Sequence, residues 1–231
     1  QVTNKQKEII EETNEELNQT NEELAAQRDE IEKQKEVVEE AHNDIKASIN
    51  YAKRIQNAIL PASSLISEYL PESFVLYKPK DVVAGDFYWL ETVAPKGNKD
   101  NTIILFAAAD CTGHGVPGAM VSVVCHNAMN RAVREFGLTE PGLILDKTRE
   151  IVVTEFEKSE DDVKDGMDIA LCSIDGTKLN YAGAHNPLWI IRGNEIIETK
   201  ADKQPIGKFD DSKPFTSHSI ELQKGDSIYL F

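Results

Sequence analysis

The chain has 231 residues, of which 40% are apolar and 28% are charged, and its formal net charge is −15. This length suffices for one medium-sized domain with an appendage, and the acidic balance argues against a surface for nucleic acid or anionic membranes. Three widely spaced cysteines (Cys111, Cys125 and Cys172) form neither a disulfide framework nor a zinc motif. They predict a reducing, cytoplasmic setting.

The first sixty residues predict one long helix, since no proline or glycine occurs before Pro61 and apolar residues recur every seven positions. These heptad positions are Ile10, Leu17, Leu24, Ile31, Val38, Ile45, Ala52 and Ile59. A heptad repeat predicts coiled-coil pairing, so we interpret residues 1–60 as a linker that forms a parallel homodimer. The second seam is mostly polar, which makes the coil weak and leaves a solvated single helix open.

Residues 61–231 form the second predicted domain, in which short apolar runs follow one another. The predicted strands are 73–79, 86–93, 102–110, 168–174, 178–184, 187–193, 195–199 and 226–231. Two segments, 116–136 and 141–157, have helical periodicity instead, and 95–101 reads as a hairpin or loop tip. Strands, then two helices, then strands again predict an α+β domain with an antiparallel sheet core.

The segment AAADCTGHGVPGAM (107–120) concentrates side chains that can do chemistry. Asp110 ends a buried strand and precedes two glycines, and such a turn can hold a hard cation because backbone oxygens approach closely. The helix that follows presents an N-terminus that favours phosphate. A helix-capping role for Asp110 stays open. Cys111 and His114 also suggest a thiol hydrolase, although nucleophile and base seldom come from neighbouring positions.

Two further segments carry polar residues between apolar ones. In DVVAGDFYWL we expect Asp86 to be partly buried, and a buried acid needs a partner or a metal. An ordinary turn role for Asp86 stays open. In NYAGAHNPLWII, Gly183, His185 and Asn186 lie at a break between two strands, and Asn-Pro is a common turn signal. The residues alone therefore favour a structural role for this second turn.

Five motifs occur in a fixed order, namely VVAGDFYWL, AAADCTGHGVPGAM, KDGMDIALCSID, NYAGAHNPLWII and QPIG. In this order they resemble the metal-dependent Ser/Thr phosphatases of the PP2C-like (PPM) family, and within it the bacterial SpoIIE-type branch, over residues 60–231. The resemblance implies an αββα four-layer sandwich of two antiparallel sheets flanked by helices, here incomplete and preceded by the coiled-coil helix. It also implies two Mn²⁺ or Mg²⁺ ions, an activated water as nucleophile, and a phosphorylated protein such as an anti-sigma antagonist as substrate.

The resemblance also implies roles for individual residues. Asp86 and Asp110 would bind the metal ions together with the backbone carbonyl of Cys111, whose thiol then needs no role. Residues in supporting turns would be Gly113, His114, Gly115, Gly183, His185 and Asn186, with Ala184 where the family more often has Gly. Gly166 and Asp168 match a motif at the start of a strand, and a metal role for Asp168 stays open.

One departure from the family pattern concerns the remaining metal carboxylates. The resemblance places them in a later Asp-Gly strand end and an Asp-Asp stretch, whereas the sequence ends at GDSIYLF, where Asp226 matches a turn residue. We therefore expect this chain alone to bind Mn²⁺ weakly and to be nearly inactive, and the full-length protein to be an active cytoplasmic phosphatase. We expect an upstream sensor domain, and a membrane tether there stays open. A non-catalytic, phosphoprotein-binding scaffold is the alternative.

Overall fold

The computed structural model describes residues 2–94, 102–158 and 164–231, so the predicted loop at 95–101 lies outside the described residues. The chain divides into two compact units, residues 1–50 and 51–231. The predicted domain boundary at residue 60 stays a prediction. No helix among the described residues combines the length and hydropathy needed to cross a membrane.

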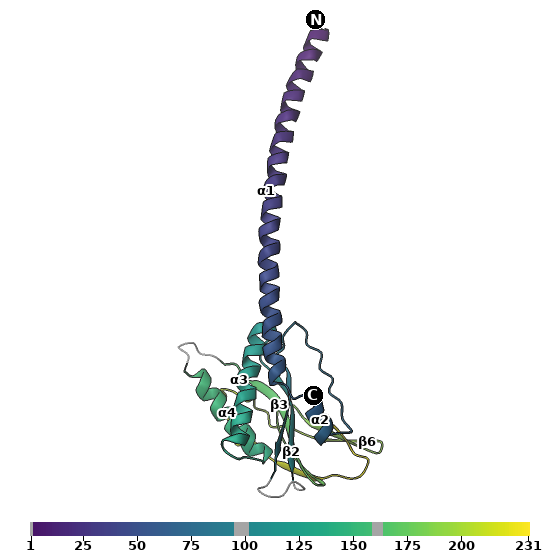
Figure 1. Cartoon of the computed structure of the whole chain (residues 1–231), viewed down its shortest axis with the longest axis vertical. Helices are drawn as coiled ribbons and strands as arrows, with labels where there is room; N and C mark the ends of the chain where they lie inside the picture. Colours follow the sequence, from purple (N-terminus) through teal and green to yellow (C-terminus); the bar gives the residue numbers. More distant parts are fainter. Residues whose placement is uncertain (1, 95–101, 159–163) are drawn as a thin grey trace. The chain divides into compact units, whose positions relative to one another are not determined.

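Unit one is helix alone, as the sequence predicted. It belongs to α1 (Val2–Ile59), which runs without a break and is the long purple-to-blue helix of Figure 1. The large apolar heptad side chains of this unit are exposed along the single chain, and they are Ile10, Leu17, Leu24, Ile31, Val38 and Ile45. An exposed apolar row at this spacing is what a coiled coil requires. Pairing itself stays a prediction.

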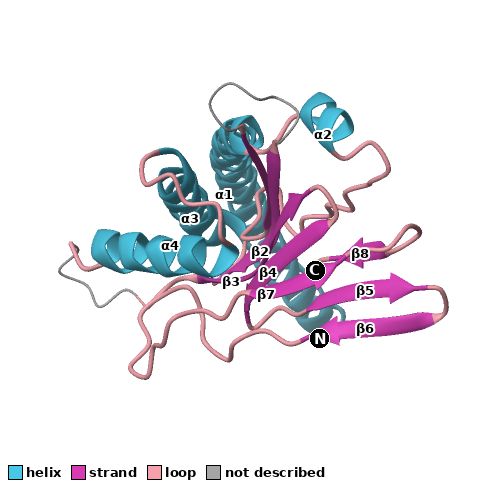
Figure 2. Ribbon diagram, turned by 90° about the horizontal axis from the view of Figure 1, so that it is seen from below, coloured by secondary structure: helices cyan, strands magenta, loops and turns pink. Residues whose placement is uncertain are grey.

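Unit two contains two antiparallel sheets (Figure 2). The larger sheet has the order β1-β2-β3-β4-β7, and its strands are Phe87–Val93, Ile103–Cys111, Met167–Asp175, Lys178–Ala184 and His218–Glu221. The smaller sheet has the order β6-β5-β8, and its strands are Glu195–Thr199, Leu188–Arg192 and Ser227–Tyr229. Every pairing between neighbouring strands is antiparallel, as predicted.

Strand β3 is central and buried on both faces, which shows how the layers are built. Ile169 and Leu171 join a core with helices α3 (Gly115–Arg134) and α4 (Pro141–Phe156). Their neighbours Ala170 and Cys172 join a second core with β4 and β5. Alternate side chains of a strand point to opposite faces, so the five-stranded sheet lies between a helix layer and the second sheet (Figure 2). The α+β sandwich predicted from the sequence is confirmed.

One predicted strand is absent from the structure, and two short elements were not predicted. Residues 73–79 form no strand, and Phe74 and Leu76 are each 80% exposed. Their apolar, β-branched and aromatic composition favours a strand, but a strand also needs a neighbour to accept its backbone hydrogen bonds. Two short elements were missed. The helix α2 (Ser63–Tyr69) has only seven residues, and the strand β7 (His218–Glu221) contains a single apolar residue, Ile220, so neither shows a period.

Candidate active site

Strand pairing brings the two predicted carboxylates together. Phe87 of β1 pairs with Ala109 of β2, which places Asp86 opposite Asp110, and Asp110 itself pairs with Asp168 of β3. Side chains of directly opposed residues lie on the same face of an antiparallel pair. Three carboxylates from three neighbouring strands therefore form a row across one end of the five-stranded sheet, which we call the carboxylate row.

The first two members of the carboxylate row interact directly. Loss of hydration against the surrounding chain raises the pKa of Asp86, and the facing Asp110 raises it further by a hydrogen bond and by its negative charge. Asp86 keeps part of its surface exposed while its neighbours Gly85 and Phe87 are buried, so its carboxyl is partly desolvated and still open to solvent. Two adjacent carboxylates at a surface are the oxygen donors that Mg²⁺ or Mn²⁺ prefers.

Backbone carbonyls add oxygen atoms beside this pair. A Cβ atom built on Gly85 would lie 2.6 Å from the carbonyl oxygen of Gly113 and 3.0 Å from that of Cys111. Both carbonyls therefore pack against the residue that precedes Asp86. A Cβ on Gly118, in the first turn of α3, would lie 2.5 Å from the same Gly113 oxygen and 3.1 Å from the Gly85 Cα. The expected metal cradle depends on close backbone contacts at Gly85 and Gly118, which the sequence did not single out.

The turn between β2 and α3 has the conformation that its glycines predicted. Gly113 and Gly115 have φ values of 84° and 63°, in the left-handed region that other residues rarely adopt. His114 between them is the N-cap residue of α3, and its Nδ1 atom lies 2.8 Å from the Oδ2 atom of Asp81. Asp81 was not predicted as a site residue.

The thiol of Cys111 lies away from this turn. Cys111 is 3% exposed and belongs to the core beneath α3 and α4. A hydrogen bond with the Cys125 thiol, together with burial, raises the pKa of the Cys111 thiol. A buried thiol that stays protonated is no nucleophile, so this environment argues against the cysteine hydrolase and agrees with a role for the carbonyl alone.

The second predicted turn meets the carboxylate row from β4. The Nδ1 atom of His185 lies 2.8 Å from the Oδ1 atom of Asp168. Tyr181 donates a hydrogen bond of 2.6 Å from its hydroxyl to the backbone oxygen of Asn186, and Gly183 leaves space for that hydroxyl because any Cβ there would overlap it. The turn is thus tied to the row through its histidine, which sequence spacing could not show.

Two polar side chains that the sequence analysis missed hold the backbone of the site. Thr112 accepts a hydrogen bond of 2.7 Å from the Gly166 N–H and donates one of 3.0 Å to the Gly166 carbonyl, which fixes the ends of β2 and β3. Gln56 near the end of α1 is buried and connects two segments that are distant in the sequence. Its Nε2 atom donates to the Ala84 carbonyl (2.6 Å) and to the Ser122 hydroxyl (3.0 Å), and its Oε1 atom accepts from the Ala84 N–H (3.1 Å).

Two of the described side chains, Asp86 and Asp110, are placed together as candidate metal ligands. Within the described parts of the chain, no group of three or more His, Cys, Asp or Glu side chains could hold a metal ion. Asp168 is the third member of the carboxylate row, but its carboxylate is paired with His185. The two carboxylates and the neighbouring carbonyls fit a hard divalent cation as part of its coordination shell.

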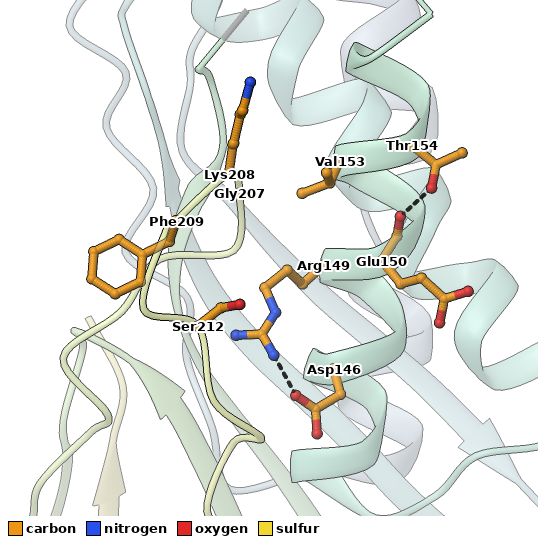
Figure 3. Close-up of a pocket in the computed structure, with 9 residues that line it drawn as sticks. All are labelled: Asp146, Arg149, Glu150, Val153, Thr154, Gly207, Lys208, Phe209 and Ser212. Atoms are coloured by element: carbon orange, nitrogen blue, oxygen red, sulfur yellow. Dashed lines mark hydrogen bonds and ion pairs between the residues drawn. The ribbon is translucent and has the colours of Figure 1, made fainter.

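A separate pocket of about 340 Å³ lies between α4 and the chain at 207–212 (Figure 3). Arg149 projects into it, and its guanidinium donates hydrogen bonds to Asp146 (2.9 Å) and Gln204 (3.1 Å). None of the predicted site residues lines this pocket. Since Arg149 ties α4 to the neighbouring loop, we assign the pocket no part in the chemistry of the carboxylate row.

The chain is similar to proteins of a known family. The family described as Stage II sporulation protein E (SpoIIE) matches residues 100–231, which is more than half of the chain. The chain belongs to the SpoIIE family. The solved structure described as the SiaA-PP2C domain of Pseudomonas aeruginosa is 33% identical, covers 82% of this chain and 72% of its own, and has a TM-score of 0.69. The SpoIIE-family chain therefore has a PP2C-like domain fold.

Two more solved structures match over a smaller share of this chain. A structure of the PP2C phosphatase domain and a regulatory fragment of SpoIIE from Bacillus subtilis is 17% identical, covers 62% of this chain and 39% of its own, and has a TM-score of 0.46. The RsbU and RsbW domains of a Mycobacterium tuberculosis protein are 18% identical, with coverages of 64% and 38% and a TM-score of 0.45. No curated protein matches this SpoIIE-family sequence.

Proposed function

We propose that this SpoIIE-family chain is the output domain of a bacterial signalling protein and hydrolyses phosphoserine or phosphothreonine on a protein substrate. The observation that carries the proposal is the pairing of Asp86 with Asp110 across β1 and β2, with the Cys111 carbonyl beside them. Like charges held this close are stabilised by a bound divalent cation. Membership of the SpoIIE family and the similarity to the SiaA-PP2C domain support the same activity.

Each residue has a defined part in the proposal. Asp86, Asp110 and the Cys111 carbonyl would hold two Mn²⁺ or Mg²⁺ ions, and such ions activate water and neutralise phosphoryl charge. Gly113 and Gly115 shape the turn that brings the carbonyls to this place. The chain itself thus supplies oxygen ligands and an open surface on which the phosphate ester can lie.

The proposed partners follow from the same assignment and from α1. The substrate would be a phosphorylated protein such as an anti-sigma antagonist, as the resemblance of the sequence motifs implies. Residues 1–60 would form a parallel homodimer through their exposed heptad positions. A sensor upstream of such a linker would act by changing the geometry of the coil.

Phosphate release from a phosphoserine peptide tests the function directly. In the full-length protein we expect turnover that requires Mn²⁺ or Mg²⁺, is abolished by a chelator, and falls by at least about 100-fold in Asp110→Asn. Asp175→Asn is the matched control, because this exposed carboxylate lies at the other end of β3. Turnover without metal, or full activity of Asp110→Asn, contradicts the proposal.

A further inference from the structure

We propose that His185 is a catalytic residue, which donates a proton to the serine or threonine oxygen that leaves the phosphate, and that Asp168 positions its ring. This inference rests on the proposed function, because it needs a phosphate ester at the Asp86–Asp110 pair. It assigns chemistry to a turn whose sequence favours only a structural role.

The turn is built to hold His185 in one place. The His185 N–H donates to the Asp202 carbonyl (2.9 Å), and the Asp202 N–H donates to the Gly183 carbonyl (3.0 Å). The Tyr181 hydroxyl fixes the next residue, Asn186. Among the described non-glycine residues, His185 alone has a positive φ, at 58°. A strained backbone persists only where its surroundings enforce it, and such residues cluster at functional sites.

Asp168 determines which ring nitrogen faces outward. The Asp168 carboxylate lies 2.8 Å from Nδ1 of His185, and a carboxylate can only accept a hydrogen bond, so Nδ1 carries the proton of this bond. The opposite ring atom, Nε2, is then the one directed away from Asp168 and available for proton transfer. The His185 side chain is 41% exposed, which leaves the ring accessible to a substrate.

The carboxylate pair and His185 lie at successive positions along the sheet edge, as expected if the phosphate is bound by the pair and its leaving oxygen faces His185. Asp110 on β2 is opposite Asp168 on β3, and His185 follows β4, so two strand spacings of about 5 Å separate the carboxylate pair from the histidine backbone. In phosphoryl transfer the attacking and leaving oxygens are in line on opposite sides of phosphorus. A phosphate bound at the pair can therefore present its leaving oxygen toward β4.

The proposed step balances without any further reagent. A water oxygen forms a bond to phosphorus as the bond to the serine oxygen breaks, and the electron pair of that bond goes to the serine oxygen. The serine oxygen takes the Nε2 proton of the His185 imidazolium, which gives the serine hydroxyl and inorganic phosphate. The neutral imidazole then regains a proton from water. Asp168 keeps its hydrogen bond to Nδ1 throughout.

The dependence on the leaving group tests this role. His185→Asn removes the imidazole and keeps a residue that tolerates positive φ. In the full-length protein with Mn²⁺, we expect kcat for a phosphoserine peptide to fall by about 100-fold or more. The kcat for p-nitrophenyl phosphate should change by less than about threefold, because its leaving group departs without a proton. Asp168→Ala should show the same selectivity with a smaller loss, because it acts only through the ring.

Asp175→Asn is the matched control, since this exposed carboxylate lies at the other end of β3 from Asp168. We expect it to leave kcat for both substrates unchanged. Equal losses on both substrates in His185→Asn, no loss at all, or a selective loss in His114→Asn instead would overturn the inference while leaving the phosphatase assignment intact. A wild-type protein with no metal-dependent activity on either substrate would overturn the proposed function and this inference with it.

Discussion

Gln56 offers a quantitative test of how α1 supports the site. Its buried amide satisfies both backbone groups of Ala84, two positions before Asp86, with hydrogen bonds of 2.6 and 3.1 Å. Gln56→Leu keeps most of the volume but leaves the Ala84 N–H and C=O buried without these partners. Each unsatisfied buried group costs about 1–3 kcal/mol. The Ser122 hydroxyl keeps its hydrogen bond to the Ala119 carbonyl and adds little to this cost.

We therefore expect Gln56→Leu to lower the free energy of unfolding of unit two by about 2–6 kcal/mol. Urea unfolding followed by the fluorescence of buried Trp89 measures this change. Gln34→Leu is the matched control, because Gln34 is exposed on the same helix and its side chain bonds to the nearby Glu30, so a change within about 0.5 kcal/mol is expected. A loss below about 0.5 kcal/mol in Gln56→Leu would refute the reasoning.

Three more predictions concern packing, assembly and pH. Gly85→Ala should destabilise the domain by about 1–3 kcal/mol and weaken Mn²⁺ binding, because its Cβ would meet the Gly113 and Cys111 carbonyls. Urea unfolding measures the stability and Mn²⁺ titration measures the binding. If neither changes, the close contact at Gly85 is refuted. Leu17→Asp with Leu24→Asp should convert a dimer to a monomer in analytical ultracentrifugation, and an unchanged mass contradicts the coiled coil. Burial, followed by the charge of Arg134, lowers the pKa of His126, so the unfolded state binds more protons. The contribution of neutral His126 to the free energy of unfolding should therefore be fully present above about pH 6.5 and be lost as the pH falls from there through the folded pKa. His126→Gln should reduce this loss of stability at low pH in unfolding curves taken at several pH values.

Periodicity along the chain predicted most of the fold. Heptad spacing located α1, and alternating or continuous apolar runs located seven of the eight strands in the described parts of the chain. These signals are local, so they need no knowledge of partners. The strand predicted at 73–79 is absent from the structure. Its composition favours a strand, but strand formation also depends on a neighbouring backbone, which a local pattern does not show. β7 contains one apolar residue, Ile220, among polar ones, which gives no apolar run and no alternation.

The candidate site was predictable in its residue types but not in its connections. Asp86 and Asp110 were identified from their motifs, yet only the β1–β2 register shows that they face one another. The link from His185 to Asp168 spans 17 positions and depends on the β3–β4 pairing. Gln56 acts on a residue 28 positions away, and a single glutamine between the apolar heptad positions Ala52 and Ile59 gives no sign of such a contact.

Mn²⁺ binding followed by electron paramagnetic resonance tests the central claim most directly, because it does not depend on turnover. We expect the full-length protein to bind Mn²⁺, and Asp86→Asn and Asp110→Asn each to weaken binding by at least about tenfold. Asp175→Asn, at the other end of the same sheet, should bind as the wild type does. Unchanged Mn²⁺ affinity in both Asp86→Asn and Asp110→Asn would contradict the assignment of this carboxylate pair as the metal centre.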